Sequence, residues 1–381
     1  MSNFSKTVEF IKNQFYKKSL VQLHEPVFFG NEKKYLNDTI ESTFVSSVGE
    51  YVTKFEKELS ILTKTKKAVA MVNGTSALQL ALKIAGVKSD DEVITQALTF
   101  VATANAISYA NAKPIFIDVD IDTYGLSPKA LEDFLLEYGE IRENGTYNKK
   151  TNRRIAACVP MHSFGFMCKI DQIIEICKNW KIPVVEDAAE ALGSSFKSKS
   201  AGNFGLINSF SFNGNKIITS GGGGAITTNN LILAEKAKYL TTTAKIPHKW
   251  NYEHSEIGYN FRMPNLNAAL ACAQLENFNE IKKNKKSLYE EYRIFFKSVG
   301  IKLVEIPKNS EWNYWLMSVI LDNKKERDMF LSETNKNQVC TRPVWELMFN
   351  LPMYKNCQKD SQINAKFLQA RTVNIPSGST R

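Results

Sequence analysis

Three sites along the chain combine a reactive or polar side chain with glycine or with the end of an apolar run. One is Lys216, which lies between the run SFSF and four consecutive glycines, Gly221–Gly224. Lysine is a poor nucleophile at its unperturbed pKa of about 10.4, but in a dry pocket or beside a cationic ring it forms a Schiff base with a carbonyl group. A lone lysine is usually a surface residue. The apolar strand and the glycines around it favour a functional role for Lys216.

The second site is Asn73-Gly74-Thr75-Ser76, which follows the apolar run AVAMV and opens a helical pattern. Glycine allows the backbone to approach a ligand closely, and amides and hydroxyls at a helix N-terminus bind phosphate. The alternative is an ordinary helix cap, since Ser and Thr are common at that position.

The third site is Asp187, at the end of IPVVED and before a run of small residues. A carboxylate there can pair with a pyridinium nitrogen and keep it protonated, so that the ring draws electrons from a substrate carbanion. The alternative is again a helix cap. A phosphate cradle, a carboxylate for a ring nitrogen and a lysine at a strand end are together much more specific than any one of them.

These sites need a framework, and the sequence predicts a parallel sheet covered by helices. Between about residues 50 and 230, short runs rich in Val, Ile and Phe alternate with helical patterns, an arrangement typical of an α/β fold. Ligands bind beyond the carboxyl ends of such strands, where the three sites lie. The seven predicted strands are Ala68–Val72, Glu92–Thr95, Pro114–Val119, Ile155–Met161, Pro183–Asp187, Asn208–Phe212 and Gly224–Thr228.

The rest of the chain predicts smaller elements around this sheet. The polar stretch Glu140–Arg154 is expected to be an exposed loop or hairpin. Phe4, Val8, Ile11 and Phe15 have helical spacing, which indicates an amphipathic helix. A long helical segment near residues 265–299 and strands near 315–321 predict a second α/β unit. We therefore expect an N-terminal arm and large domain over residues 1–255 and a smaller C-terminal α/β domain over 256–381.

Composition narrows the functional class. With 43% hydrophobic and 23% charged residues, the chain has the make-up of a globular protein. Its net charge of +10 comes from lysines spread along the chain, which predicts no nucleic-acid partner and suits an anionic small substrate. The six cysteines occur singly, which predicts no metal site and reduced thiols in the cytoplasm. No stretch predicts a membrane span.

In their order along the chain, these motifs resemble the sugar aminotransferases of the DegT/DnrJ/EryC1/StrS type, from about Phe28 to the end. The resemblance implies a fold-type I pyridoxal-phosphate enzyme, with a seven-stranded, mostly parallel sheet in the large domain. It also implies pyridoxal 5'-phosphate as cofactor, glutamate as amino donor, a nucleotide-linked keto-sugar as acceptor and a homodimer with shared active sites. The chain departs from the commonest pattern after the lysine, where a glycine replaces a glutamate.

The resemblance also implies a role for individual residues. Lys216 is the catalytic lysine that binds the cofactor, and Asp187 is the partner of its ring nitrogen. Phe100 stacks on the ring, with a core position as the alternative. Glu190 lies where relatives often carry Gln or His, and Asn260 reaches the phosphate of the neighbouring subunit. The implied cofactor residues are Gly74, Thr75, Ser76, Phe100, Asp187, Glu190, Ser211 and Asn260, and the expected substrate residues are His162 and Arg262.

Three of these assignments have a structural alternative. Asn260 and Arg262 can instead be anchors of a loop. His162, at the end of a predicted strand, is expected to line the cleft, and the alternative is a buried histidine whose nitrogens have protein partners.

The segment Thr341–Lys355 resembles the subgroup that acts at C4 of UDP-linked 2-acetamido-2,6-dideoxy-4-keto-hexoses, on routes to bacillosamine-like or legionaminic-acid-like sugars. An aminotransferase for a C3 ketone is a close alternative. Another is a sugar dehydratase of the same fold, in which histidine typically replaces the lysine, so that Lys216 argues against it. A protein of another class, a regulator that keeps the fold without turnover, stays open because fold alone does not establish function.

Overall fold

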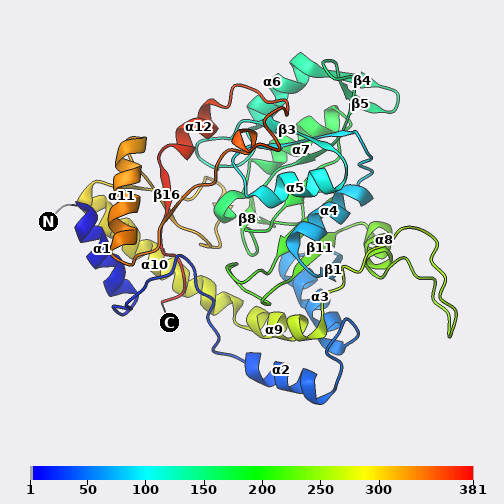
Figure 1. Ribbon diagram of the computed structural model, residues 1–381, viewed down its shortest axis with the longest axis horizontal. Helices are drawn as coiled ribbons and strands as arrows, with labels where there is room; N and C mark the ends of the chain where they lie inside the picture. Colours follow the sequence, from blue (N-terminus) through cyan, green and yellow to red (C-terminus); the bar gives the residue numbers. More distant parts are fainter. Residues whose placement is uncertain (1–2, 381) are drawn as a thin grey trace.

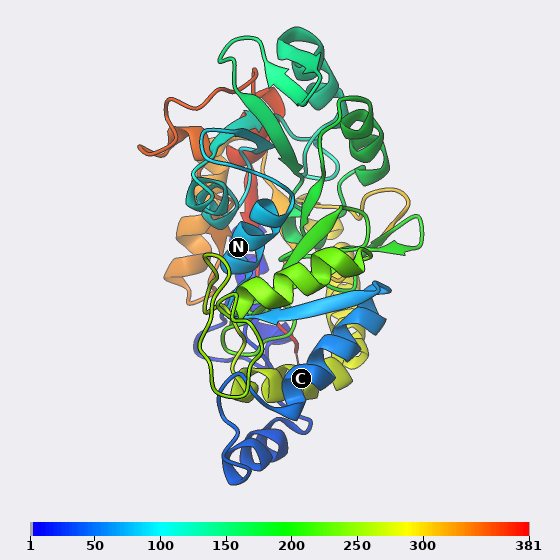
Figure 2. The ribbon, with the colours of Figure 1, turned by 90° about the vertical axis from the view of Figure 1, so that its right-hand side faces the viewer.

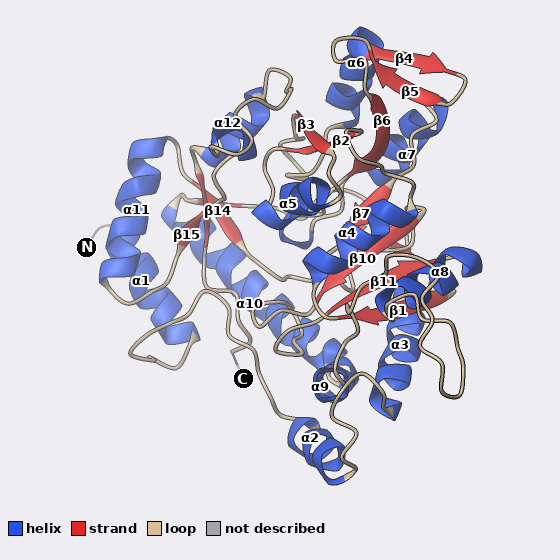
Figure 3. Ribbon diagram, turned by 45° about the vertical axis from the view of Figure 1, so that its right-hand side comes forward, coloured by secondary structure: helices blue, strands red, loops and turns tan. Residues whose placement is uncertain are grey.

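A computed structural model describes residues 3–380 (Figure 1), and its largest feature is a sheet with strand order β3-β2-β6-β7-β10-β11-β1, whose strands are labelled in Figure 3. All seven strands lie at the predicted runs, so the predicted α/β fold is confirmed. Their bounds are β1 (Lys67–Met71), β2 (Glu92–Gln96), β3 (Lys113–Ile117), β6 (Arg154–Val159), β7 (Val185–Asp187), β10 (Ile207–Ser211) and β11 (Gly224–Thr228).

The sheet is parallel except for β11, which pairs antiparallel with both β10 and β1. Its two halves meet between β6 and β7, where the N–H of Cys158 donates to Pro183 O at 2.9 Å and the N–H of Asp187 donates to Pro160 O at 3.0 Å. Because strands of one direction end at one edge, this topology gathers the strand ends near Asn73, Asp187 and Ser211.

Helices cover both faces of the sheet because crossovers between parallel strands return over a face (Figure 3). The helix after β1 begins where the side chain of Asn73 accepts a hydrogen bond from the N–H of Ser76 at 2.8 Å, and its apolar residues Leu78, Ala81 and Leu82 are buried. The helices of this part are α3 (Glu50–Thr63), α4 (Gly74–Ile84), α5 (Val101–Tyr109), α6 (Pro128–Tyr138), α7 (Ile170–Asn179), α8 (Leu231–Thr241) and α9 (Asn265–Glu276).

A second, antiparallel sheet in the order β12-β14-β16-β15 forms the centre of the C-terminal part. One of its strands falls within the region near 315–321 where a strand is predicted. Its elements are α10 (Phe278–Val299), β12 (Lys302–Leu303), β14 (Ser318–Ile320), α11 (Lys324–Lys336), β15 (Arg342–Pro343), α12 (Ile363–Gln369) and β16 (Thr372–Asn374).

The amphipathic N-terminal helix is confirmed as α1 (Asn3–Gln14), and it packs on the C-terminal part (Figure 1). Phe4 contacts Phe330 of α11 edge to face, with ring centroids 5.3 Å apart. Phe10 stacks on Phe295 of α10 at 4.0 Å. The first residues of the chain thus stabilise its last third, while the division at residue 255 stays a prediction.

The remaining elements are short or peripheral. The stretch 140–154 contains most of the hairpin β4 and β5, and β5 pairs antiparallel with the first residues of β6. Helix α2 projects at one end of the molecule and packs on α9 (Figure 2). No helix within residues 3–380 is long and apolar enough to cross a membrane. These elements are α2 (Glu32–Glu41), β4 (Gly139–Arg142), β5 (Gly145–Asn148), β8 (Ser195–Phe196), β9 (Lys199–Ser200) and β13 (Ser310–Glu311), with short 3-10 turns at Ser163–Gly165 and Met348–Asn350.

Candidate active site

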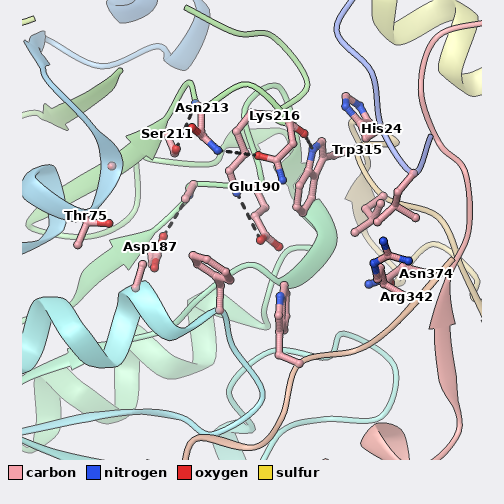
Figure 4. A pocket seen from close by; sticks show the side chains of 18 of the residues that line it. His24, Thr75, Asp187, Glu190, Ser211, Asn213, Lys216, Trp315, Arg342 and Asn374 are labelled. Atoms are coloured by element: carbon pink, nitrogen blue, oxygen red, sulfur yellow. Dashed lines mark hydrogen bonds and ion pairs between the residues drawn. The ribbon is translucent and has the colours of Figure 1, made fainter. Parts of the chain in front are cut away.

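A cavity of about 740 Å³ lies at the carboxyl ends of β1, β7 and β10, and the C-terminal part forms its opposite wall (Figure 4). Open α/β sheets bind ligands at this edge. The structure brings together seven of the predicted site residues on the cavity wall, namely Gly74, Thr75, Phe100, Asp187, Glu190, Ser211 and Lys216.

One end of the cavity is built to bind an anion. The N–H groups of Gly74 and Thr75 stand in the first turn of α4, where helix geometry leaves them without a partner inside the helix, and the hydroxyl of Ser211 lies nearby on β10. A Cβ added to Gly74 would lie 2.7 Å from the Cβ of Ser211, so only glycine lets α4 begin this close to β10. Ser76, also predicted here, is not on the cavity wall, and its N–H donates to Asn73.

Asp187 is a buried carboxylate at the end of β7, with 6% of its surface exposed. Its Oδ2 accepts a hydrogen bond from the hydroxyl of Thr103 at 2.8 Å, and its Oδ1 accepts one from the N–H of Ala189 at 3.2 Å. Burial raises the pKa of Asp187, and these two hydrogen bonds oppose that rise. A carboxylate in this position favours a cationic group beside it.

Helix α5 supplies both Thr103 and the aromatic residue at its own N-terminus. Phe100 is 49% exposed and lines the cavity, so the alternative of a core position is wrong. An aromatic face open to a cavity offers a surface on which a planar ring can stack. That role for Phe100 stays a prediction.

Lys216 enters the cavity from the turn after β10 (Figure 4). Its Nζ lies 3.5 Å from Oε1 of Glu190 and 4.4 Å from the ring centroid of Trp315, and 12% of its side chain is exposed. Burial raises the pKa of Glu190 to about 7, although the positive charge of Lys216 lowers it. Lysine and carboxyl thus form a close pair inside the cavity, and burial and the lysine charge act on the carboxyl in opposite directions.

The loop before β14 fixes this pair from the C-terminal side, which the sequence did not predict. Asn313 is fully buried, and its side-chain amide donates to Glu190 O at 2.8 Å and to Leu192 O at 3.0 Å, while its Oδ1 accepts from the N–H of Trp315. The indole N–H of Trp315 in turn donates to Asn215 O at 2.7 Å. The run EWNYWLM shows that the segment is aromatic, but nothing in its spacing indicates which loop it contacts.

His162 is not where it was expected. It is fully buried behind the cavity wall, and both ring nitrogens have protein partners: Nδ1 accepts from the N–H of Cys168 at 3.2 Å, and Nε2 lies 3.0 Å from Oε2 of Glu186. Because Nδ1 accepts, Nε2 carries the proton and donates to the carboxylate. This position gives no support to a substrate-binding role, since no atom of His162 reaches the cavity.

Asn260 and Arg262 also lie away from the cavity of their own chain. Asn260 is exposed, and its Oδ1 accepts from Nη2 of Arg262 at 3.0 Å. Arg262 lines a separate surface depression together with Thr243 and His254. Within one chain neither residue lies on the wall of the predicted site.

The residues present fit pyridoxal phosphate. The anion-binding end suits its phosphate, the buried carboxylate of Asp187 suits its ring nitrogen, and the aromatic face of Phe100 suits its ring. Lys216 is the amine that can bind its aldehyde. The cavity volume, within the range of small-ligand pockets, leaves room for a substrate beside the cofactor.

Comparison with known proteins agrees with this geometry. The family model described as the DegT/DnrJ/EryC1/StrS aminotransferase family matches residues 29–380. The chain is 34% identical to GDP-perosamine synthase of Escherichia coli O157:H7 over 94% of this chain and 93% of that protein. It is 33% identical to UDP-2-acetamido-2-deoxy-3-oxo-D-glucuronate aminotransferase of Pseudomonas aeruginosa, over 73% of this chain and 72% of that one.

Among solved structures, the aminotransferase from Psychrobacter cryohalolentis is similar, with a TM-score of 0.82, 25% identity and 93% of each chain covered. The expected fold type, family and cofactor are therefore confirmed. The chain belongs to the DegT/DnrJ/EryC1/StrS aminotransferase family, the sugar aminotransferases that work with pyridoxal phosphate.

Proposed function

We propose that this chain transfers an amino group from glutamate to the C4 ketone of a UDP-linked 2-acetamido-2,6-dideoxy-4-keto-hexose. The observation that carries the proposal is the position of Lys216 Nζ in a cavity that also holds Asp187 and an anion-binding helix terminus. The choice of C4 rests on the segment Thr341–Lys355, whose sequence resembles the C4 subgroup. Residues 342–346 of that segment line the same cavity.

The cofactor supplies an electron sink for the carbanion that forms when a substrate carbon loses its proton. The protein residues do the rest. The N–H groups of α4 and the hydroxyl of Ser211 hold the phosphate, and Asp187 keeps the ring nitrogen protonated because a buried carboxylate favours a neighbouring positive charge. Phe100 holds the ring plane.

Lys216 moves protons to and from the reacting carbons of the two substrates. Its Nζ takes the proton from the α-carbon of the amino donor and, in the second half of the cycle, donates one to C4 of the sugar. Glu190 stands 3.5 Å from Nζ and orients it within the cavity. Trp315 covers Nζ on the other side and excludes water.

The proposed enzyme is a homodimer whose active sites are shared. The loop that leads to Asn260 exposes large apolar side chains, with Trp250 72%, Tyr252 81% and Ile257 81% exposed. Exposed apolar groups clustered on one loop favour coverage by a protein partner. A second copy seated there would bring Asn260 of the partner subunit toward the phosphate end of the cavity.

A second candidate is amino transfer to a C3 ketone. The relative from P. aeruginosa is named for a 3-oxo sugar, which supports this alternative. The relative from E. coli is named for a GDP-linked sugar, so the nucleotide is also to be tested.

One experiment separates these possibilities. Purified protein with pyridoxal phosphate and glutamate would be incubated with UDP- and GDP-linked 4-keto and 3-keto sugars, and the products identified by mass spectrometry and NMR. We expect an amine at C4 of the UDP-linked 2-acetamido-2,6-dideoxy sugar. An amine at C3, preference for a GDP sugar, or loss of water without amine transfer would each contradict the proposal.

A further inference from the structure

The segment between α1 and α2 crosses the C-terminal part and forms one side of the cavity. Its backbone is held there, because the N–H of Ser377 donates to Leu23 O at 2.8 Å. Leu23 and the half-buried His24 line the cavity (Figure 4). The ring of His24 lies 6.4 Å from that of Trp315, and Nζ of Lys216 lies 4.4 Å from the same Trp315 ring. The segment thus places a histidine close to Lys216.

His24 contacts Lys285, a lysine of α10 that is fully buried. Nζ of Lys285 lies 3.0 Å from Nε2 of His24 and also donates to Ser377 O. Within residues 3–380 no carboxylate pairs with this lysine, and burial lowers its pKa to about 7. A buried amine without an acidic partner costs stability, which points to a role beyond packing.

The contact with Lys285 fixes which nitrogen of His24 carries a proton. Burial lowers the pKa of His24 well below its usual value, and the positive charges of Lys285 and Lys216 lower it further, so the imidazole is neutral. A charged lysine has no acceptor, so Nε2 accepts from Lys285 and the proton lies on Nδ1. Nδ1 is buried and has no partner among residues 3–380. Its N–H is therefore the group of His24 that is left for a ligand.

The charge and the position of His24 decide which ligand atom it suits. A neutral N–H brings no charge to attract a carboxylate or a diphosphate, and it suits an uncharged carbonyl oxygen. Carbons 2 and 4 of a hexose are two bonds apart, so a sugar with C4 at Lys216 carries its C2 substituent into the same part of the cavity. The carbonyl groups of the uracil ring lie much farther from C4, beyond the ribose and two phosphates.

We propose that His24 donates a hydrogen bond from Nδ1 to the carbonyl oxygen of the sugar's 2-acetamido group, and that Lys285 is the residue that positions His24 for it. This inference rests on the proposed function and names the contact that separates a 2-acetamido sugar from a 2-hydroxy sugar. A 2-hydroxyl is too short to take the place of the acetamido carbonyl, so it leaves the N–H of His24 unpaired. A neutral Lys285 can accept a hydrogen bond from Nε2, so it no longer holds the proton of His24 on Nδ1.

The test follows the cofactor absorbance of the holoenzyme in its amine form, in single-turnover reactions at increasing sugar concentration. Two acceptors are compared, the UDP-linked 2-acetamido-2,6-dideoxy-4-keto-hexose and its 2-hydroxy analogue. We expect His24→Ala to raise the apparent Kd of the 2-acetamido sugar about tenfold, the loss typical of one hydrogen bond, and to leave the maximal rate unchanged. The apparent Kd of the 2-hydroxy analogue and the glutamate half-reaction should not change.

Lys285→Met tests the positioning role, because it keeps the length of the side chain and removes the amine. We expect it to raise the same apparent Kd about as much as His24→Ala does, and the double variant to be no worse than either, since both changes remove one hydrogen bond. Lys286→Met is the matched control, because Lys286 is the next residue of α10 and is exposed. It should bind the 2-acetamido sugar as the wild type does.

The pH dependence gives a readout that a merely structural lysine would not change. Below pH 7 Lys285 is protonated, and the wild type should bind the 2-acetamido sugar about tenfold more tightly than Lys285→Met. This advantage should shrink as the pH rises above 7 and Lys285 loses its proton. Glu190 and Lys216 are present in both proteins, so their titration cancels in the comparison. An advantage that stays constant across this range would refute the positioning role.

His24→Asn keeps the test decisive if Lys285→Met folds poorly. Its side-chain amide places an N–H close to the position of Nδ1, so it should recover part of the affinity that His24→Ala loses. An unchanged apparent Kd in His24→Ala would remove His24 from the site. Equal losses for the 2-acetamido and 2-hydroxy sugars would assign its contact to another part of the nucleotide sugar, and a defect confined to the glutamate half-reaction would assign it to the donor.

Additive losses in the double variant would show that Lys285 does not act through His24. Failure of the proposed function would look different from all of these results. In that case the amine form of the wild type would transfer its amino group to no UDP-linked 2-acetamido-4-keto sugar.

Discussion

The two walls of the cavity are built in different ways. The wall from the large sheet consists of residues at the end of a strand or just beyond it, such as Asn73, Asp187 and Ser211. The wall from the C-terminal part includes Trp315 in the loop before β14, and Arg342 and Asn374, which meet because short strands pair across long separations in the chain. In the proposed function the first wall carries the cofactor chemistry and the second faces the substrate. The first wall follows from local sequence, whereas the second depends on tertiary structure.

The strongest test of the first wall is Lys216→Ala. We expect turnover to fall by about 10,000-fold or more, because the proposed function has this residue both bind the cofactor and transfer the proton. The visible absorption band of the bound cofactor should disappear, and borohydride reduction of the wild type should label Lys216 alone. Labelling of another lysine in the wild type would refute the assignment.

The next largest effect is expected for Asp187→Asn, which removes the negative charge of the carboxylate. We expect a loss of about 100-fold in turnover. A neutral amide does not raise the pKa of the ring nitrogen as the carboxylate does, so less of the cofactor would carry a protonated ring. The fold should persist, since the one oxygen of Asn can still accept from the N–H of Ala189, and the hydroxyl of Thr103 can turn to accept from the new amide. Near-normal turnover would mean that Asp187 only caps its loop.

Glu190 links the two walls and gives a pH-dependent prediction. Its folded pKa of about 7 lies above its unfolded value of 4.5, so between pH 4.5 and 7 the folded state binds more protons than the unfolded state. Stability that this group contributes at low pH is therefore lost as the pH rises through that window. Relative to Glu190→Gln, the wild type should lose about 3 kcal/mol of unfolding free energy between pH 4.5 and 7.5.

Urea unfolding of both proteins without cofactor at several pH values would measure this difference. Equal pH dependence of the two would show that Glu190 is ionised throughout. A wild type that gains stability relative to the variant as the pH rises would show that Lys216 lowers its pKa below the unfolded value.

Asn313→Ala tests the contact between the walls. Asn313 joins the backbone of Glu190 and Leu192 to that of Trp315, and its removal leaves buried backbone groups without partners. We expect a loss of about 2 kcal/mol of stability. Turnover should fall further than in Lys308→Ala, a control at an exposed residue in the turn before β13 that lies off the cavity wall. Turnover equal to that of the control would show that the C-terminal wall of the cavity keeps its structure without Asn313.

The contrast between the walls also explains what the sequence could predict. Lys216 and Asp187 stand beside strands whose apolar runs are unmistakable, so both strands and site residues could be found. His162 also follows a strand, yet it lies behind the wall because Cys168 and Glu186 take both of its nitrogens. Arg342 and Asn374 lie on strands of two and three residues, which carry no periodic signal, and their pairing depends on register that only the folded chain defines.

The smallest expected effect concerns Asn260, which lies on neither wall of the cavity. If Asn260 completes the phosphate site of the partner subunit, Lys216→Ala and Asn260→Ala subunits should be inactive or strongly impaired alone and partly active when mixed. In a mixed dimer, the cavity with wild-type Lys216 faces wild-type Asn260 of the partner subunit, and the other cavity lacks both. Random exchange of two subunits gives half mixed dimers with one competent site each, so about a quarter of wild-type activity should return.

The measurement is turnover after exchange, with dimer composition confirmed by native mass spectrometry. The control is Lys216→Ala protein mixed with itself. Mixed dimers that stay inactive, or an active monomer, would show that each cavity is complete within one chain.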